Sequence, residues 1–162
     1  MFKIGEYVIY KRDLCLINDI INEKYYKLSI INDDTLTIKV PIDNKFGHLR
    51  YPISLTEANQ IISKIPSISP IKTNEKLLEN DYINLLKTNK HEDLIKIIKT
   101  TYLRNKERLD AGKKIGDKDQ TYFELAEKYL YNELSYALKI SYEDCKMYII
   151  ECVTKMNGDI SE

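Results

Sequence analysis

The sequence predicts an α+β protein in which a small, strongly bent β-barrel precedes a bundle of four to five helices. Two observations predict this class. Short β-rich runs separated by polar turn segments fill residues 6–53, whereas the later residues carry apolar side chains at the spacing of amphipathic helices. Because 162 residues are enough for two small domains, we expect one domain for each pattern.

Alternation in the N-terminal part is plainest in its last strand candidate, the segment TLTIKV at residues 35–40. There Leu36, Ile38 and Val40 should face a core, and Lys39 should face outward. An open sheet of so few short strands would leave long unpaired edges, so we expect a barrel of SH3 or Tudor type. The strands are expected at residues 6–10, 14–21, 25–31 and 35–40.

The pattern changes at Ser54, where Ser followed three residues later by Glu57 forms a capping box that opens a helix. Pro66 and Pro70 cannot continue that helix, so the boundary between the domains is expected beside them. The predicted organisation is therefore a β-domain at 1–53, a connecting helix and proline-containing linker at 54–71, and a helical domain at 72–162.

Four helices are predicted in the C-terminal domain, at about 75–88, 91–108, 119–139 and 142–156. The second carries one apolar stripe, formed by Leu94, Ile97, Ile98, Thr101 and Tyr102. The last begins at a second capping box and should place one face in the core, formed by Cys145, Tyr148, Ile149, Cys152 and Met156.

Composition excludes several function classes. The sequence has equal numbers of basic and acidic residues, so no overall positive charge indicates nucleic-acid binding. No apolar run is long enough to span a membrane, and the N-terminus lacks a signal-peptide pattern, so a cytoplasmic protein is expected. Three cysteines and two histidines form no metal-ligand or nucleophile motif, and no phosphate-binding loop is present. We therefore expect no metal, no cofactor, no small-molecule substrate and no enzymatic activity.

The segments FKIGEYVIY at 2–10, LTIKVP at 36–41 and DNKFGHLR at 43–50, in this order, resemble the CarD family of bacterial transcription regulators. The opening FKIGEYVIY is similar to the family's F-K-x-G-D-x-V-V-Y start, and LTIKVP at 36–41 is similar to a family strand that ends in a hydrophobic residue, a basic residue, Val and Pro. DNKFGHLR at 43–50 resembles the D-N-x-x-G-x-R stretch that follows. Further on, LKTNK at 86–90 and AEKYLYNEL at 126–134 resemble the family's inter-helix turn and a later helix.

The resemblance implies that the β-domain is a Tudor-like module that binds the β subunit of RNA polymerase by adding a strand edge to its sheet. Lys39 matches the family's basic contact residue, and the same strand supplies Thr37, Val40 and Pro41. The alternation itself is equally compatible with a strand lysine whose role is to discourage edge aggregation.

The resemblance also implies that the helical domain meets upstream promoter DNA and alters the stability of the open complex. The family places a Trp wedge in the minor groove, but this sequence has no Trp. A local basic excess between residues 99 and 118 could contact DNA instead, through Lys99, Arg104, Lys106, Arg108, Lys113 and Lys114. Two alternatives remain: solvated basic residues placed to suit a helix dipole, or a polymerase-bound protein adaptor that has lost DNA contact. Tyr82 and Tyr102 are candidates for stacking on unpaired bases.

Overall fold

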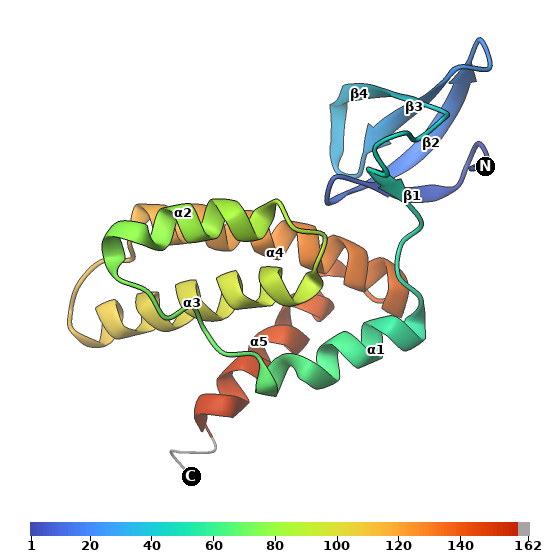
Figure 1. The fold of residues 1–162 in the computed structure, drawn as a ribbon. Coiled ribbons are helices and arrows are strands. Elements are labelled where there is room, and N and C mark those ends of the chain that lie inside the picture. Colours follow the sequence, from blue (N-terminus) through green and yellow to red (C-terminus); the bar gives the residue numbers. More distant parts are fainter. Residues whose placement is uncertain (159–162) are drawn as a thin grey trace. The chain divides into compact units, whose positions relative to one another are not determined.

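The computed structural model describes the backbone of residues 1–158, and the side chains of these residues except residue 34 and residues 153–158. The chain divides between Ser54 and Leu55 into two compact units, a β-unit and a helical unit. Figure 1 shows the strands confined to the first unit and the helices to the second. The predicted α+β class is confirmed in this coarse form.

The β-unit is one antiparallel sheet of five strands in the order β4-β3-β2-β1-β5. Its core is a cluster of buried side chains that includes Val8, Cys15, Ile17, Tyr26 and Leu28. A register shift between Ile17 and Asp19 bends the pairing of the second and third strands. The strands are β1 (Tyr7–Tyr10), β2 (Asp13–Ile21), β3 (Tyr25–Ile30), β4 (Asp33–Pro41) and β5 (Leu49–Arg50).

The sheet is not closed into a full barrel, since β4 and β5 are its two edges and do not pair with each other among the described residues. The prediction that Leu36 faces the core is wrong, because its side chain is 51% exposed. A register shift explains this: Thr37 pairs with Ser29, but the next pair joins Ile30 to Asp33, so the residues between lie outside the regular ladder. Val40 is 5% exposed, as the alternation predicts.

The helical unit consists of five helices that pack together. Helices α2, α3 and α4 lie against one another, α5 packs on α4, and α1 also packs on α4 (Figure 1). A short 3-10 turn that follows α1 contacts α5. The elements are α1 (Leu55–Lys64), the turn η1 (Ile65–Ser67), α2 (Glu75–Leu86), α3 (His91–Asp110), α4 (Asp117–Leu138) and α5 (Tyr142–Gly158).

Helix α3 is buried on more than the one stripe that its sequence predicts. Leu94, Ile97 and Ile98 are buried as expected, but Ile95 and Lys99 are buried as well. Residues four apart share a face of a helix, so these last two form a second buried face. The cause is the central position of α3, which has α2 and α4 as neighbours and is also reached by the chain around η1.

Helix α5 turns Cys145 and Ile149 into the core, which confirms part of the predicted face. Tyr148 is exposed and does not belong to that face, and Cys152 is half-buried. Met156 lies outside the residues whose side chains are described. Among residues 1–158, no helix combines the length and the hydrophobicity that a membrane span requires.

Candidate functional site

The free edge of β4 carries the residues that the sequence points to for partner binding. β4 pairs with β3 on one side and is the last strand of the sheet on the other. The side chains of Thr37, Lys39 and Pro41 are exposed, whereas Val40 lies in the core. Three of the four predicted contact residues therefore share one exposed face, and Val40 acts only by anchoring the strand.

The backbone groups of the three exposed residues, Thr37, Lys39 and Pro41, face away from the sheet. Just beyond the end of β4, the Ile42 N–H donates to the Lys24 carbonyl at 2.9 Å. Hydrogen-bonded and non-hydrogen-bonded pairs alternate along an antiparallel ladder, so Val40, two residues before Ile42, also bonds to β3. The residues at the alternate positions, Thr37, Lys39 and Pro41, therefore direct their backbone groups outward. A proline at such a position removes no ladder bond. The edge thus presents two outward N–H donors and a row of carbonyls.

Lys39 lies directly opposite Lys27 of β3 in the register, and Lys27 in turn lies opposite Asp19 of β2. The two lysines form one of the non-hydrogen-bonded pairs, in which side chains come closest. Like charges that face each other across a ladder are destabilising. An acidic side chain on a strand added beside β4 would relieve this repulsion.

The basic residues predicted to contact DNA do not form one surface. Lys99 is 1% exposed and donates its ammonium hydrogens to the carbonyls of Ile65 and Ile68, the latter at 2.6 Å. Burial lowers the pKa of this ammonium. Lys99 therefore joins α3 to the turn after α1 and has no exposed charge to offer a phosphate. Three residues of the set are exposed: Lys106, Lys113 and Lys114.

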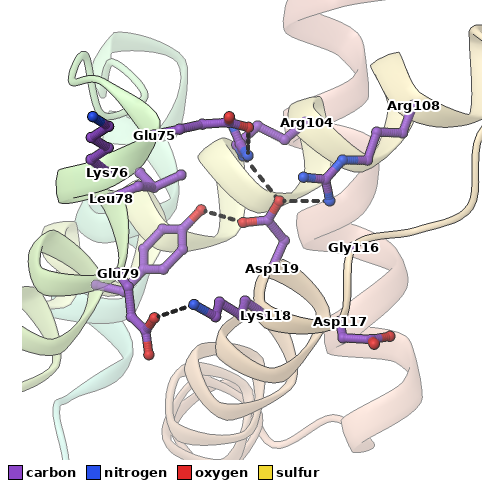
Figure 2. Close-up of a pocket in the computed structure, with 11 residues that line it drawn as sticks. Glu75, Lys76, Leu78, Glu79, Arg104, Arg108, Gly116, Asp117, Lys118 and Asp119 are labelled. Carbon is purple, nitrogen blue, oxygen red and sulfur yellow. Dashed lines mark hydrogen bonds and ion pairs between the residues drawn. The ribbon is translucent and has the colours of Figure 1, made fainter.

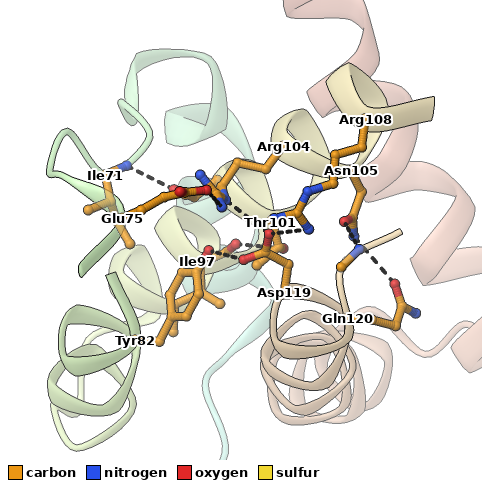
Figure 3. Close-up of polar contacts among 12 residues, drawn as sticks. Ile71, Glu75, Tyr82, Ile97, Thr101, Arg104, Asn105, Arg108, Asp119 and Gln120 are labelled. Atoms are coloured by element: carbon orange, nitrogen blue, oxygen red, sulfur yellow. Dashed lines mark hydrogen bonds and ion pairs between the residues drawn. The ribbon is translucent and has the colours of Figure 1, made fainter. Parts of the chain in front are cut away.

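Arg104 and Arg108 converge on one buried carboxylate, Asp119, at the start of α4 (Figure 2). The Arg104 Nε donates to Asp119 Oδ2 at 2.9 Å, and Arg108 Nη1 lies 3.1 Å from the same oxygen as an ion pair. The Tyr82 hydroxyl donates to Asp119 Oδ1 at 2.9 Å. Arg104 also donates to Glu75 on α2 at 2.8 Å. We call these five residues the Asp119 network (Figure 3).

The contacts within the Asp119 network shift the pKa values of Tyr82, Arg104 and Glu75 toward their hydrogen-bonded forms. Burial and the hydrogen bond to Asp119 raise the pKa of the Tyr82 hydroxyl, so it stays a donor. Burial by itself would lower the pKa of Arg104, but the bonds to Glu75 and Asp119 raise it overall. The hydrogen bond from Arg104 lowers the pKa of Glu75. Both guanidinium groups are thus neutralised by internal carboxylates rather than left for an external anion.

A pocket of about 550 Å³ lies beside the network, between α2 and the ends of α3 and α4. Acidic and basic side chains line it in equal number, and Lys118 pairs with Glu79 at 2.8 Å across it (Figure 2). Gly116 lies directly against Arg108, where a Cβ would meet Nη1 at 1.5 Å. The balanced charge gives the pocket no general attraction for phosphates, and its contacts are those of a structural joint between three helices.

Sequence reasoning missed Asp119 and Glu75 as partners of the arginines. The available signal was the acidic first turn of each helix, which is common and does not identify a partner. Tyr82 is 1% exposed and packs on Tyr122 with the ring centroids 5.0 Å apart, so it cannot stack on a base. Within residues 1–158, no three His, Cys, Asp or Glu side chains gather in a way that could hold a metal ion.

Comparison with known proteins adds no identification at this point. No model of a protein family matches the sequence, and no curated protein matches it.

Proposed function

We propose that the β-unit is a Tudor-like module that binds the β subunit of bacterial RNA polymerase by strand addition at the edge of β4, and that the protein regulates transcription from the bacterial cytoplasm. The observation that carries the proposal is the coincidence of two independent features on one strand. β4 has a free edge with outward backbone groups at Thr37, Lys39 and Pro41, and the same strand carries the LTIKVP segment that resembles the CarD family.

The charge arrangement supports a partner strand with an acidic residue. Lys27 and Lys39 face each other across the ladder, so an acidic side chain placed beside them gains attraction and also relieves their repulsion. The alternative role of Lys39, to discourage edge aggregation, needs no partner and predicts no effect on polymerase binding.

In the proposed function the helical unit lies near upstream promoter DNA and alters the lifetime of the open complex. Support for this part comes from the exposed lysines at the end of α3 and in the loop that follows, Lys106, Lys113 and Lys114. Each such contact to a phosphate adds affinity that falls steeply with salt.

A second function, from a different class, is a polymerase-bound adaptor that recruits another protein. A specific observation favours it: of the six residues proposed to touch DNA, Lys99 is buried and both arginines are neutralised by Asp119 and Glu75. The sequence also lacks the Trp wedge of the family it resembles.

The polymerase proposal is tested with the full chain and bacterial RNA polymerase core enzyme, by co-elution and by measured affinity. Lys39→Glu should weaken binding by about tenfold or more. Thr37→Pro should do the same, because it removes a donor that faces the edge and no bond of the sheet itself. Lys11→Glu makes the same charge change on the turn between β1 and β2 and should leave affinity unchanged. Folded Lys39→Glu and Thr37→Pro variants that bind as tightly as the wild type would refute the proposal.

Binding of the full chain to a fluorescent promoter duplex separates the regulator from the adaptor. A regulator should bind with an affinity that falls steeply between about 50 mM and about 200 mM salt, and should lose binding in a triple Glu variant of Lys106, Lys113 and Lys114. An adaptor should show no such binding at either salt concentration.

A further inference from the structure

A pocket lies at the C-terminal end of the β4 edge, beside Pro41. Its volume is about 450 Å³. Its walls come from the last residue of β4, the two residues after it and the turn that leads into β3. The lining residues are Glu23, Lys24, Tyr25, Pro41, Ile42 and Asp43.

The apolar wall of this pocket is a cross-strand pair, Tyr25 of β3 and Pro41 of β4. The pair is one of the non-hydrogen-bonded pairs, in which side chains come closest. Tyr25 is 42% exposed, whereas its neighbour Tyr26 is buried in the core. An aromatic ring and a proline ring therefore lie side by side on the exposed face of the sheet, next to the free edge.

The charged side chains of the pocket carry both signs. Glu23 and Asp43 are acidic, and Lys24 is basic. Charges of both signs select no charged occupant. The apolar wall of Tyr25 and Pro41 suits instead an aliphatic or aromatic side chain, which keeps its contact with the rings and leaves the charged groups in solvent.

The stretch of β4 that a partner strand can use is short and has fixed ends. On the N-terminal side, the register shift between Thr37 and Asp33 interrupts the ladder. On the C-terminal side, Pro41 has no N–H to offer, so the ladder with a partner ends opposite it. A partner strand therefore pairs at Thr37, Lys39 and Pro41, and its residue opposite Pro41 lies next to the pocket.

Each of these three positions ends a row of side chains that crosses the exposed face of the sheet. The rows are Ile21–Tyr25–Pro41, Asp19–Lys27–Lys39 and Leu16–Ser29–Thr37. The first row is apolar, the second ends in two lysines, and the third ends in two small hydroxyl side chains. Side chains that lie directly opposite each other interact across a ladder, so a partner strand continues all three rows.

We propose that this pocket holds one side chain of the added strand and so determines which strands bind. The partner then has a large apolar residue opposite Pro41, an acidic residue opposite Lys39 and a small hydroxyl residue opposite Thr37, at alternate positions. The inference rests on the proposed strand addition at β4 and adds a specificity pocket to it. Backbone bonds give affinity in this mode of binding, and pockets for alternate side chains give specificity.

The order of the three residues follows from the direction of the added strand. Every strand pair of this sheet is antiparallel, and antiparallel pairing is the more stable kind. In an antiparallel partner the large apolar residue comes first, the acidic residue two positions later and the hydroxyl residue last. The two residues between them lie beside Ile38 and Val40, where β-branched apolar side chains fit.

The probe is the peptide Phe-Val-Glu-Val-Thr, capped at both ends and labelled with fluorescein through a Gly-Ser linker. It is titrated with the full chain and followed by fluorescence anisotropy. Replacement of its Phe by Ala should weaken binding by about fivefold or more. The peptide Glu-Val-Phe-Val-Thr has the same composition but places Phe opposite Lys39, and it should bind as weakly as the Ala peptide.

A matched pair of protein variants tests the pocket itself. Tyr25→Thr removes the aromatic wall and keeps a residue that favours strands. It should weaken binding of the Phe peptide by about fivefold and leave binding of the Ala peptide unchanged. Tyr148→Ala, at a comparably exposed tyrosine of α5, should alter neither. If Tyr25→Thr does not fold, the Phe and Ala peptides with the wild-type chain still decide the outcome.

Hydrogen exchange reports whether the peptide binds as a strand. In the ¹⁵N-labelled chain, the outward N–H groups of Thr37 and Lys39 should exchange more slowly with solvent when the peptide is bound. The amide shifts caused by the peptide should concentrate at residues 23–25 and 37–43. Shifts without slower exchange at Thr37 and Lys39 would contradict strand addition.

Three further results would overturn the inference. The first is no binding of the Phe peptide at about 1 mM, the weakest affinity worth assigning to a site. The second is equal binding of the Phe peptide, the Ala peptide and the rearranged peptide. The third is tighter binding of the reversed peptide, Thr-Val-Glu-Val-Phe, than of the probe.

The pocket and the polymerase proposal can fail separately. Polymerase binding that depends on Lys39 but not on Tyr25 would uphold the proposed function and overturn the role of the pocket. Peptide binding in the expected order, without binding of polymerase, would uphold the pocket and assign the β4 edge to a different strand-adding partner.

Discussion

Replacing Asp119 with Asn should destabilise the helical unit by about 2–4 kcal/mol. The Asp119 carboxylate is 4% exposed and accepts from Tyr82 and Arg104 while it pairs with Arg108. Removing one member of a buried charge pair costs about 3–5 kcal/mol, because the remaining charge is left uncompensated. The two arginine side chains are more than a quarter exposed, so solvent screening reduces that figure. Asn keeps an acceptor for Tyr82 but loses the negative charge.

The assay is urea unfolding of the full chain followed by far-UV circular dichroism. All of the described helices belong to the helical unit, so the helical signal reports its unfolding. Asp117→Asn is the matched control, since it makes the same change on an exposed residue of the same helix. Both residues lie in the first turn of α4, so the interaction with the helix dipole is common to both and cancels in the comparison.

The control should cost less than about 1 kcal/mol, the range of an exposed helix-dipole interaction. An Asp119→Asn variant within about 0.5 kcal/mol of the wild type, or no less stable than Asp117→Asn, would show that the network does not hold the three helices together.

Three further predictions concern buried polar groups of the helical unit. Tyr131 is fully buried, and its hydroxyl has no hydrogen-bond partner among the described residues, so Tyr131→Phe should leave the free energy of unfolding unchanged or raise it. Tyr82→Phe loses the hydrogen bond to Asp119 and should lower the free energy of unfolding by about 1.5–3 kcal/mol in the same urea assay. Burial raises the pKa of Glu127 above its ordinary value of 4.5, against the opposing effect of Lys146, so the folded state binds the proton more tightly than the unfolded state does. The stability that Glu127 contributes is present below pH 4.5 and is lost as the pH rises through the pKa of Glu127 in the folded state. Glu127→Gln should remove this pH dependence of the unfolding free energy. A variant with the same pH profile of unfolding as the wild type would contradict the raised pKa of Glu127.

Several features of the fold could be predicted because they depend on neighbouring residues. The two capping boxes, the strand alternation around Val40 and the apolar stripe of Leu94, Ile97 and Ile98 are local patterns, and each corresponds to an element or a buried face in the structure. Leu36 departs from its pattern because a register shift is set by how β3 and β4 pair, which the residues of β4 do not encode by themselves.

The basic residues show most clearly where sequence reasoning ends. Residues 99–118 carry a basic excess, and a count of charge treats every member alike. The structure separates them: Lys99 is buried against backbone carbonyls, Arg104 and Arg108 are neutralised by Asp119 and Glu75, and Lys106, Lys113 and Lys114 stay exposed.

The sequence by itself determined the class of the chain, the change from strands to helices near Ser54 and the identity of the edge residue Lys39. Only the tertiary structure decided which charges remain available to a partner. Asp119 lies 15 residues from Arg104 and 37 from Tyr82, so the bonds that neutralise the arginines form only when three helices pack. Secondary structure follows from short-range spacing, whereas the neutralisation of a charge depends on which distant residue is brought within hydrogen-bond distance.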